Sequence, residues 1–163
     1  MNPSLLFPDQ ISSIAKNVLP LLQKIEPASH AYNTELHHAM KQPFFSHEEQ
    51  ESFKKKISLA YFRLGITLKD IFSETDPIIL PLTDIMRQAD RDCSVETIAV
   101  CNRILEAYMQ LQDDVGIFCA ESEESIVFSE QIPLNDLSVL LRRLIFHANQ
   151  SCLALEETIK LCE

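Results

Sequence analysis

Four histidines fall within eighteen positions of this 163-residue chain and are the side chains best suited to bind a metal ion: His30, His37, His38 and His47. Glu35 and His38 form a Glu-x-x-His pair, the i,i+3 arrangement with which helical bundles hold iron or manganese. Such a centre needs a second pair of the same kind, and the sequence contains none. We therefore expect a polar, solvent-facing helix here. The alternative is a metal-binding helical-bundle enzyme or sensor that holds iron, manganese or zinc on His30, Glu35, His37 and His38.

Phosphotransfer is a second chemistry to weigh, because residues 38–41 (His-Ala-Met-Lys) resemble the start of the histidine phosphotransfer motif. The resemblance implies that His38 would accept the phosphoryl group on a bundle helix. Gln42 stands where that family has glycine, and Pro43 ends a helix that the family continues. The sequence has no GxSxG, HExxH, P-loop or GxGxxG motif, and only two glycines. It therefore favours a non-enzymatic role.

Acidic residues dominate the charge of the chain. Asp and Glu number 24 against 14 Lys and Arg, which gives a formal net charge of −10 and makes nucleic acid or an anionic membrane an unsuitable partner. No Lys or Arg lies between Arg103 and Arg142. A surface of one sign steers a partner of the opposite sign, so we predict a basic protein partner. The acids predicted to bind it, expected at a solvated surface, are Glu106, Asp113, Asp114, Glu121, Glu123, Glu124 and Glu130.

The cysteines and the first residues of the chain indicate a compartment. Five cysteines with wide spacing and no CxxC are predicted to be reduced thiols. Residues 1–10 carry no Lys or Arg before a short apolar stretch, unlike a secretory signal. No apolar run is long enough for a transmembrane helix. We expect a cytoplasmic protein that does not insert into membranes.

The elements that must position these side chains are helices. Apolar residues recur at intervals of three and four along most of the chain, and no segment alternates long enough to predict a strand. Three long helices are expected at about 47–73, 94–120 and 134–162, the first opened by a capping box of Ser46 and Glu49. The predicted fold is all-α, a compact single-domain bundle of five to six helices over residues 1–163.

Other features of the sequence predict the breaks between helices. Pro20 interrupts the apolar pattern of the first helix, and a second helix is expected at 28–41. Asp76 followed by Pro77 is typical of a helix start, here of a shorter helix that runs toward Arg91. The alternative is that Pro81 delays the regular start of this helix by one turn. The pattern fades after residue 120, so we expect an acidic loop at about 121–132 that packs residues 126–128 against the bundle.

The last predicted helix carries more apolar residues than one packing seam needs. Leu137, Leu141 and Leu144 begin a heptad pattern that continues to Cys162, while Leu140 and Phe146 lie on other sides of the helix. These extra residues either lie in the bundle's own core or form a docking surface, for another protein or for a second copy in a homodimer. The predicted function is therefore protein–protein interaction by an adaptor, a client-specific chaperone or an assembly subunit. Apolar helix faces would provide the affinity.

Overall fold

The protein is all-helical in the part of the chain that the structure describes. The computed structural model describes residues 4–40, 46–127 and 134–163, although the side chains at 35–37, 39–40, 124–127 and 134–135 are outside this description. Its helices are α1 (Pro8–Leu22), α2 (Ile25–Met40), α3 (His47–Ile79), α4 (Pro81–Arg91), α5 (Val95–Val127) and α6 (Leu134–Cys162). The prediction of an all-α fold is confirmed.

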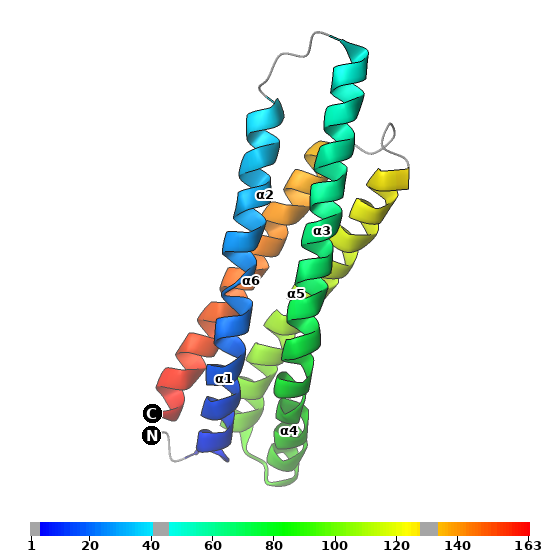
Figure 1. The fold of residues 1–163 in the computed structure, drawn as a ribbon. Helices are drawn as coiled ribbons and strands as arrows, with labels where there is room; N and C mark the ends of the chain where they lie inside the picture. Colours follow the sequence, from blue (N-terminus) through cyan, green and yellow to red (C-terminus); the bar gives the residue numbers. More distant parts are fainter. Residues whose placement is uncertain (1–3, 41–45, 128–133) are drawn as a thin grey trace.

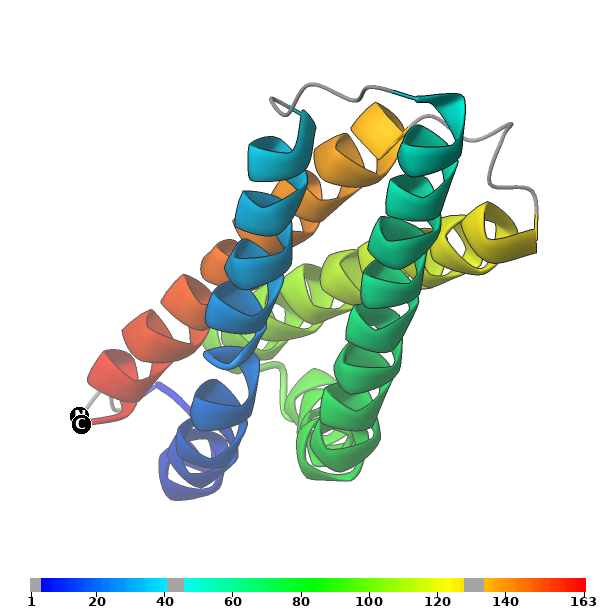
Figure 2. The same ribbon diagram turned by 45° about the horizontal axis from the view of Figure 1, so that its top comes forward.

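The six described helices join into four rods, which corrects the expectation of a bundle of five to six helices. Only residues 23–24 separate α1 from α2, and only Leu80 separates α3 from α4. The rods run up, down, up and down, and each packs against two neighbours (Figures 1 and 2). Helix α1 and the end of α6 lie side by side at one end of the bundle, where Lys16 of α1 and Glu163 form an ion pair of 3.8 Å.

The core lies between the four rods and is built from the apolar stripes of the sequence. Tyr61 of α3 meets Phe118 of α5 edge to face, with ring centroids 5.7 Å apart, and both side chains are buried. Leu64, Leu111 and Leu144 are also completely buried. No helix in the described ranges has the length and apolar character needed to cross a bilayer.

The start of α3 follows the predicted capping box. The backbone N–H of Glu49 donates to Ser46 Oγ at 3.1 Å, and Ser46 has the extended backbone of an N-cap residue. Pro20 lies inside α1, which ends two residues later at Leu22. The second helix begins at Ile25, three residues before the predicted start.

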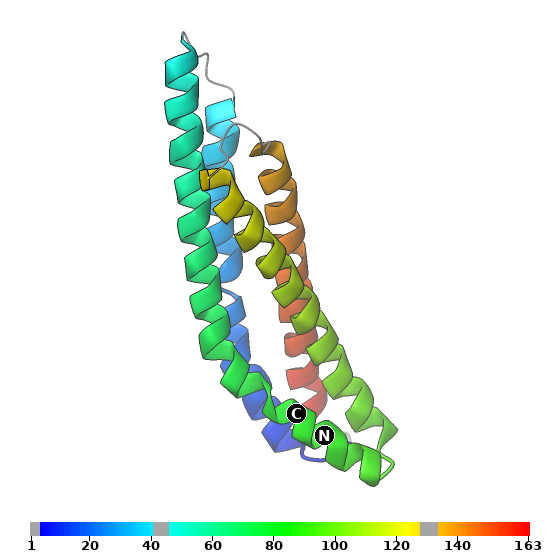
Figure 3. The same cartoon turned by 90° about the vertical axis from the view of Figure 1, so that its right-hand side faces the viewer.

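The predicted helix start at Asp76-Pro77 is wrong. Helix α3 continues through Pro77 to Ile79, and α4 begins at Pro81, the delayed start that was the alternative. Pro77 has no N–H to donate to the preceding turn, so the rod bends at this region (Figure 3). The buried positions Phe72, Ile79 and Leu82 continue one apolar stripe across the junction, which holds both helices against the core despite the proline.

The predicted acidic loop at 121–132 is wrong in its first half. Helix α5 continues to Val127, which places residues 126 and 127 in the helix, whereas residues 128–132 lie outside the described part of the chain. Ser122 is buried and donates from Oγ to the carbonyl of Phe118 at 2.7 Å, so its hydroxyl is satisfied inside the helix. A polar residue on the buried face thus lets the helix extend where the apolar pattern stops.

Candidate functional site

The outward surface of α5 carries acidic and apolar side chains in alternation. Glu106, Met109, Asp113 and Ile117 follow one another at helical spacing, so they share one side of the helix. All four are exposed, with exposed fractions of 60% for Met109 and 43% for Ile117. We call these four residues the α5 outer face.

A groove between α3 and α5 lies next to the α5 outer face. It has a volume of about 370 Å³ and is lined by Lys69, Phe72, Ser73, Asp76, Gln112, Val115 and Gly116. Phe72 and Val115 are buried and provide apolar surface. A Cβ atom added at Gly116 would meet no atom within 4 Å, so the space beside this position is open. This groove is the α3–α5 groove below.

Asp76 supplies a carboxylate to the α3–α5 groove. The Tyr108 hydroxyl donates to Asp76 Oδ1, and Gln112 Nε2 donates to the same oxygen at 2.7 Å. Burial, and then the hydrogen bond to Asp76, raises the pKa of the Tyr108 phenol above its ordinary value. Tyr108 therefore remains a neutral donor that fixes Asp76 on α3 against α5.

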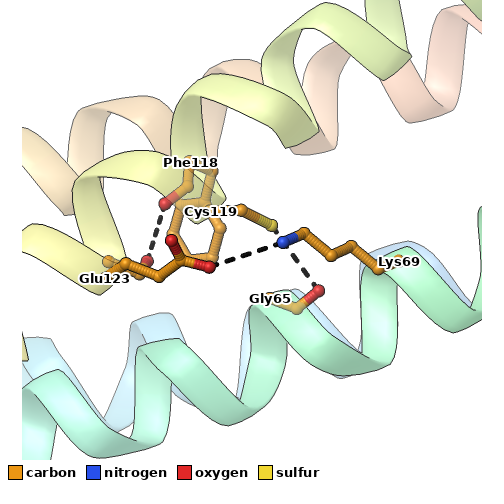
Figure 4. Close-up of polar contacts among 6 residues, drawn as sticks. Gly65, Lys69, Phe118, Cys119 and Glu123 are labelled. Carbon is orange, nitrogen blue, oxygen red and sulfur yellow. Dashed lines mark hydrogen bonds and ion pairs between the residues drawn. The ribbon is translucent and has the colours of Figure 1, made fainter.

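The other end of the α3–α5 interface is closed by an ion pair and a close backbone approach (Figure 4). Lys69 Nζ lies 3.5 Å from Glu123 Oε1, with both side chains more than half exposed. Below them, Cys119 Sγ donates to the carbonyl of Gly65 at 3.6 Å, and burial raises the pKa of this thiol. Gly65 lets the two helices approach here, because a Cβ atom added to it would lie 3.1 Å from Cys119 Sγ.

Asp114 is not at the surface, in contrast to the expectation for the acids of this interval. Its side chain is 2% exposed and points to α6, where Arg143 Nε donates to Oδ1 at 3.2 Å and His147 Nδ1 hydrogen-bonds to Oδ2. These partners could not be identified from the sequence, because they lie about thirty residues away from Asp114 along the chain. One signal could have found the site: Asp114 follows Leu111 by three and precedes Phe118 by four, so it lies on the buried stripe of α5.

The other predicted partner-binding residues are distributed over two helices. Glu121 and Leu140 are half-buried, Glu123 is exposed, and Phe146 is 57% exposed on α6. The side chains of residues 124 and 130, which complete the predicted set as Glu124 and Glu130, lie outside the described part of the chain. The structure thus brings Glu106 and Asp113 together on one helix face and leaves Phe146 on another helix.

The histidine cluster of the sequence is described only in part. His30 and His38 are exposed on α2, whereas the side chains of Glu35 and His37 are outside the description. Among the described residues, no group of three or more His, Cys, Asp or Glu side chains is arranged to hold a metal ion.

Comparison of the chain with models of protein families, with curated proteins and with solved structures found no match.

Proposed function

We propose that this protein is a non-enzymatic binding module that takes a basic, amphipathic segment of another protein along the α5 outer face and the α3–α5 groove. The observation that carries the proposal is the alternation of exposed acids with exposed apolar side chains at Glu106, Met109, Asp113 and Ile117. A basic helix with one apolar face complements such a surface in both charge and hydrophobicity.

The two kinds of residue would act at different stages of binding. The chain's net charge of −10 attracts a basic partner over distances of about a Debye length, and the exposed acids of α5 orient it. Met109 and Ile117 then exclude water beneath the partner's apolar residues. Methionine suits this task because its flexible thioether side chain adapts to different apolar surfaces.

A labelled peptide of alternating Leu and Lys blocks, designed as an amphipathic helix, tests the electrostatic part by fluorescence anisotropy. The double variant Glu106→Lys with Asp113→Lys should weaken binding at least tenfold. The matched control, Asp84→Lys with Asp90→Lys on α4, makes the same change in net charge away from the α5 outer face. Equal loss in both double variants would refute a specific α5 site and leave only general attraction.

The apolar part is tested with the same peptide at high salt, where surface charges are screened. Met109→Ser with Ile117→Ser should lower the remaining affinity, whereas Leu59→Ser with Ile66→Ser removes exposed apolar side chains from α3 and should not. A photoreactive amino acid at Asp113 should then cross-link to the peptide. A cross-link only from α3, or none, would contradict the proposal.

A further inference from the structure

The polar end of the α3–α5 groove carries hydrogen-bond acceptors that the described fold does not use. The Tyr108 hydroxyl and Gln112 Nε2 both donate to Asp76 Oδ1, so the two lone pairs of that oxygen are occupied. Asp76 Oδ2 receives no donor from any residue that the structure describes, although Asp76 lines the groove. One oxygen of this carboxylate is therefore held by the fold, and the other is available to a ligand.

Two further acceptors line the same groove. Gln112 donates to Asp76 through its amide nitrogen, and within the described ranges no donor reaches its Oε1. Ser73 Oγ donates its single hydrogen to the carbonyl of Lys69 at 3.0 Å, so this oxygen can only accept a further hydrogen bond. The groove thus offers acceptors on three side chains to a ligand that donates hydrogen bonds.

The walls next to these acceptors are apolar. Phe72 and Val115 are buried and line the groove, and the space beside Gly116 is open. The Phe72 ring packs on the Tyr108 ring, with centroids 5.4 Å apart, which holds this wall in place. A ligand that fits has an apolar stem and a polar head, which is the arrangement of a long basic side chain.

The cation that lines the groove does not pair with Asp76. Lys69 Nζ lies 3.5 Å from Glu123 Oε1, at the other end of the α3–α5 interface (Figure 4). Lys69 and Asp76 are seven residues apart on α3, which is about 10 Å along the helix. A cationic ligand would therefore meet a carboxylate that has no ion-pair partner in the described part of the chain.

We propose that this end of the α3–α5 groove binds the ammonium group of one lysine of the partner, through Asp76, Gln112 and Ser73. The inference rests on the proposed function, because the same partner occupies the groove and the α5 outer face. An ammonium group has three donor hydrogens and no acceptor, which matches the three acceptor side chains. The lysine stem would cover Phe72 and Val115.

Lysine fits this end of the groove better than arginine. A guanidinium group binds most strongly when its two parallel N–H groups reach both oxygens of a carboxylate. Here Tyr108 and Gln112 already fill Asp76 Oδ1, which leaves one oxygen. An ammonium group is a compact donor and needs only that oxygen. We therefore expect the groove to discriminate between two side chains of the same charge.

Two labelled peptides of the same amphipathic design, one with lysine and one with arginine at every basic position, test this preference by fluorescence anisotropy. Their equal charge gives them the same long-range attraction, so the ratio of their affinities reports the contacts at close range. The lysine peptide should bind about tenfold more tightly, the value of one hydrogen bond to a charged group. Asp76→Asn retains an acceptor for Tyr108 and Gln112 but removes the charge, and should abolish the preference. Asp70→Asn, the same change at an exposed aspartate of α3, should preserve it.

The lysine subsite and the proposed function can fail separately. Ser73→Ala removes one acceptor without changing the charge and should also reduce the preference, and circular dichroism checks that each variant remains folded. If Asp76→Asn and Ser73→Ala leave the preference unchanged while Glu106→Lys with Asp113→Lys still weakens binding, the lysine subsite is overturned and the proposed function stands. If neither peptide binds, both are overturned.

Butylammonium chloride tests the subsite without the rest of the partner. This probe carries the lysine stem and its ammonium group, so its binding does not depend on the α5 outer face. At constant ionic strength it should shift the side-chain amide signals of Gln112 saturably in nitrogen-15 NMR spectra of the wild type and of Asp70→Asn. The same titration of Asp76→Asn should give no saturable shift. Absence of a saturable shift in the wild type, or an equal shift in Asp76→Asn, would overturn the lysine subsite.

Discussion

Replacing Asp114 by alanine should destabilise the fold, although the same change at its neighbour Asp113 should not. The two residues have the same chemistry and adjacent positions, yet Asp114 is buried between α5 and α6 while Asp113 faces solvent. Asp114→Ala removes the carboxylate that both Arg143 and His147 contact. Comparing the two alanine variants therefore separates the contribution of the buried contacts from that of replacing an aspartate as such.

The size of the effect follows from the exposure of the two side chains that lose this carboxylate. Removing one member of a buried ion pair usually costs about 3–5 kcal/mol, because the remaining charge stays buried without a partner. Here the Arg143 and His147 side chains are 48% and 22% exposed, so water can solvate both of them after the change. We therefore expect a loss of about 2 kcal/mol, which for a chain of this length lowers Tm by roughly 6 °C.

Urea unfolding followed by far-ultraviolet circular dichroism at pH 7 measures both variants. Asp113→Ala is the matched control and should remain within about 0.5 kcal/mol of the wild type, as is usual for exposed positions. If Asp114→Ala also remained within about 0.5 kcal/mol, the α5–α6 ion pair would contribute nothing to stability, and the reasoning would be refuted.

Three further predictions concern α3 and α5. Gly116→Ala should raise the unfolding free energy by about 0.5–1 kcal/mol in urea unfolding, because the site is helical and open. Gly65→Ala should raise the unfolding free energy less, because the added Cβ would lie 3.1 Å from the Cys119 sulfur atom. An equal increase for both variants would contradict this packing. Tyr108→Phe should cost about 1 kcal/mol in the same assay, because Asp76 loses a donor, and no change would show that the bond is not stabilising. Burial, with a smaller effect of the Cys162 thiol, raises the pKa of Cys101 from 9.0 to about 11. Between these two pH values the thiol ionises only in the unfolded chain, so the free energy of unfolding should fall as the pH rises from 9 to 11. Cys101→Ala should reduce that slope, and an unchanged slope would assign it to other groups.

The sequence predicted the fold class because the apolar period of α3, α5 and α6 is sustained over many turns. The point where the apolar pattern stops did not predict where a helix ends. Buried Ser122 satisfies its hydroxyl on the preceding turn, so α5 continues where hydrophobicity alone predicts a loop. Asp76-Pro77 has the residue types of a helix start, but the apolar stripe on both sides of it keeps the rod continuous.

The candidate site was predictable in its charges and not in its geometry. The absence of Lys and Arg from the interval before Arg142 drew attention to α5, and the binding role predicted for its acids stays a prediction. Which acids face solvent depends on the orientation of α5 in the bundle, and that orientation separates Asp113 from Asp114. The α3–α5 groove could not be foreseen, because it forms only where Phe72 of one helix meets Val115 of another.

The position of the start of α1 beside the end of α6 determines how this protein would respond to mechanical tension. A force applied at Ser4 and Glu163 first pulls residues 4–6 from the start of α5, where Ser94 Oγ donates to the Ser4 carbonyl and the Leu6 N–H donates to Thr97 Oγ1. It then separates α1 from α6 at the Lys16–Glu163 pair, at right angles to the rods. Contacts along the α1–α6 seam then break one after another instead of sharing the load. The bundle should therefore unzip at low force when it is stretched from its ends, even if its resistance to urea is high.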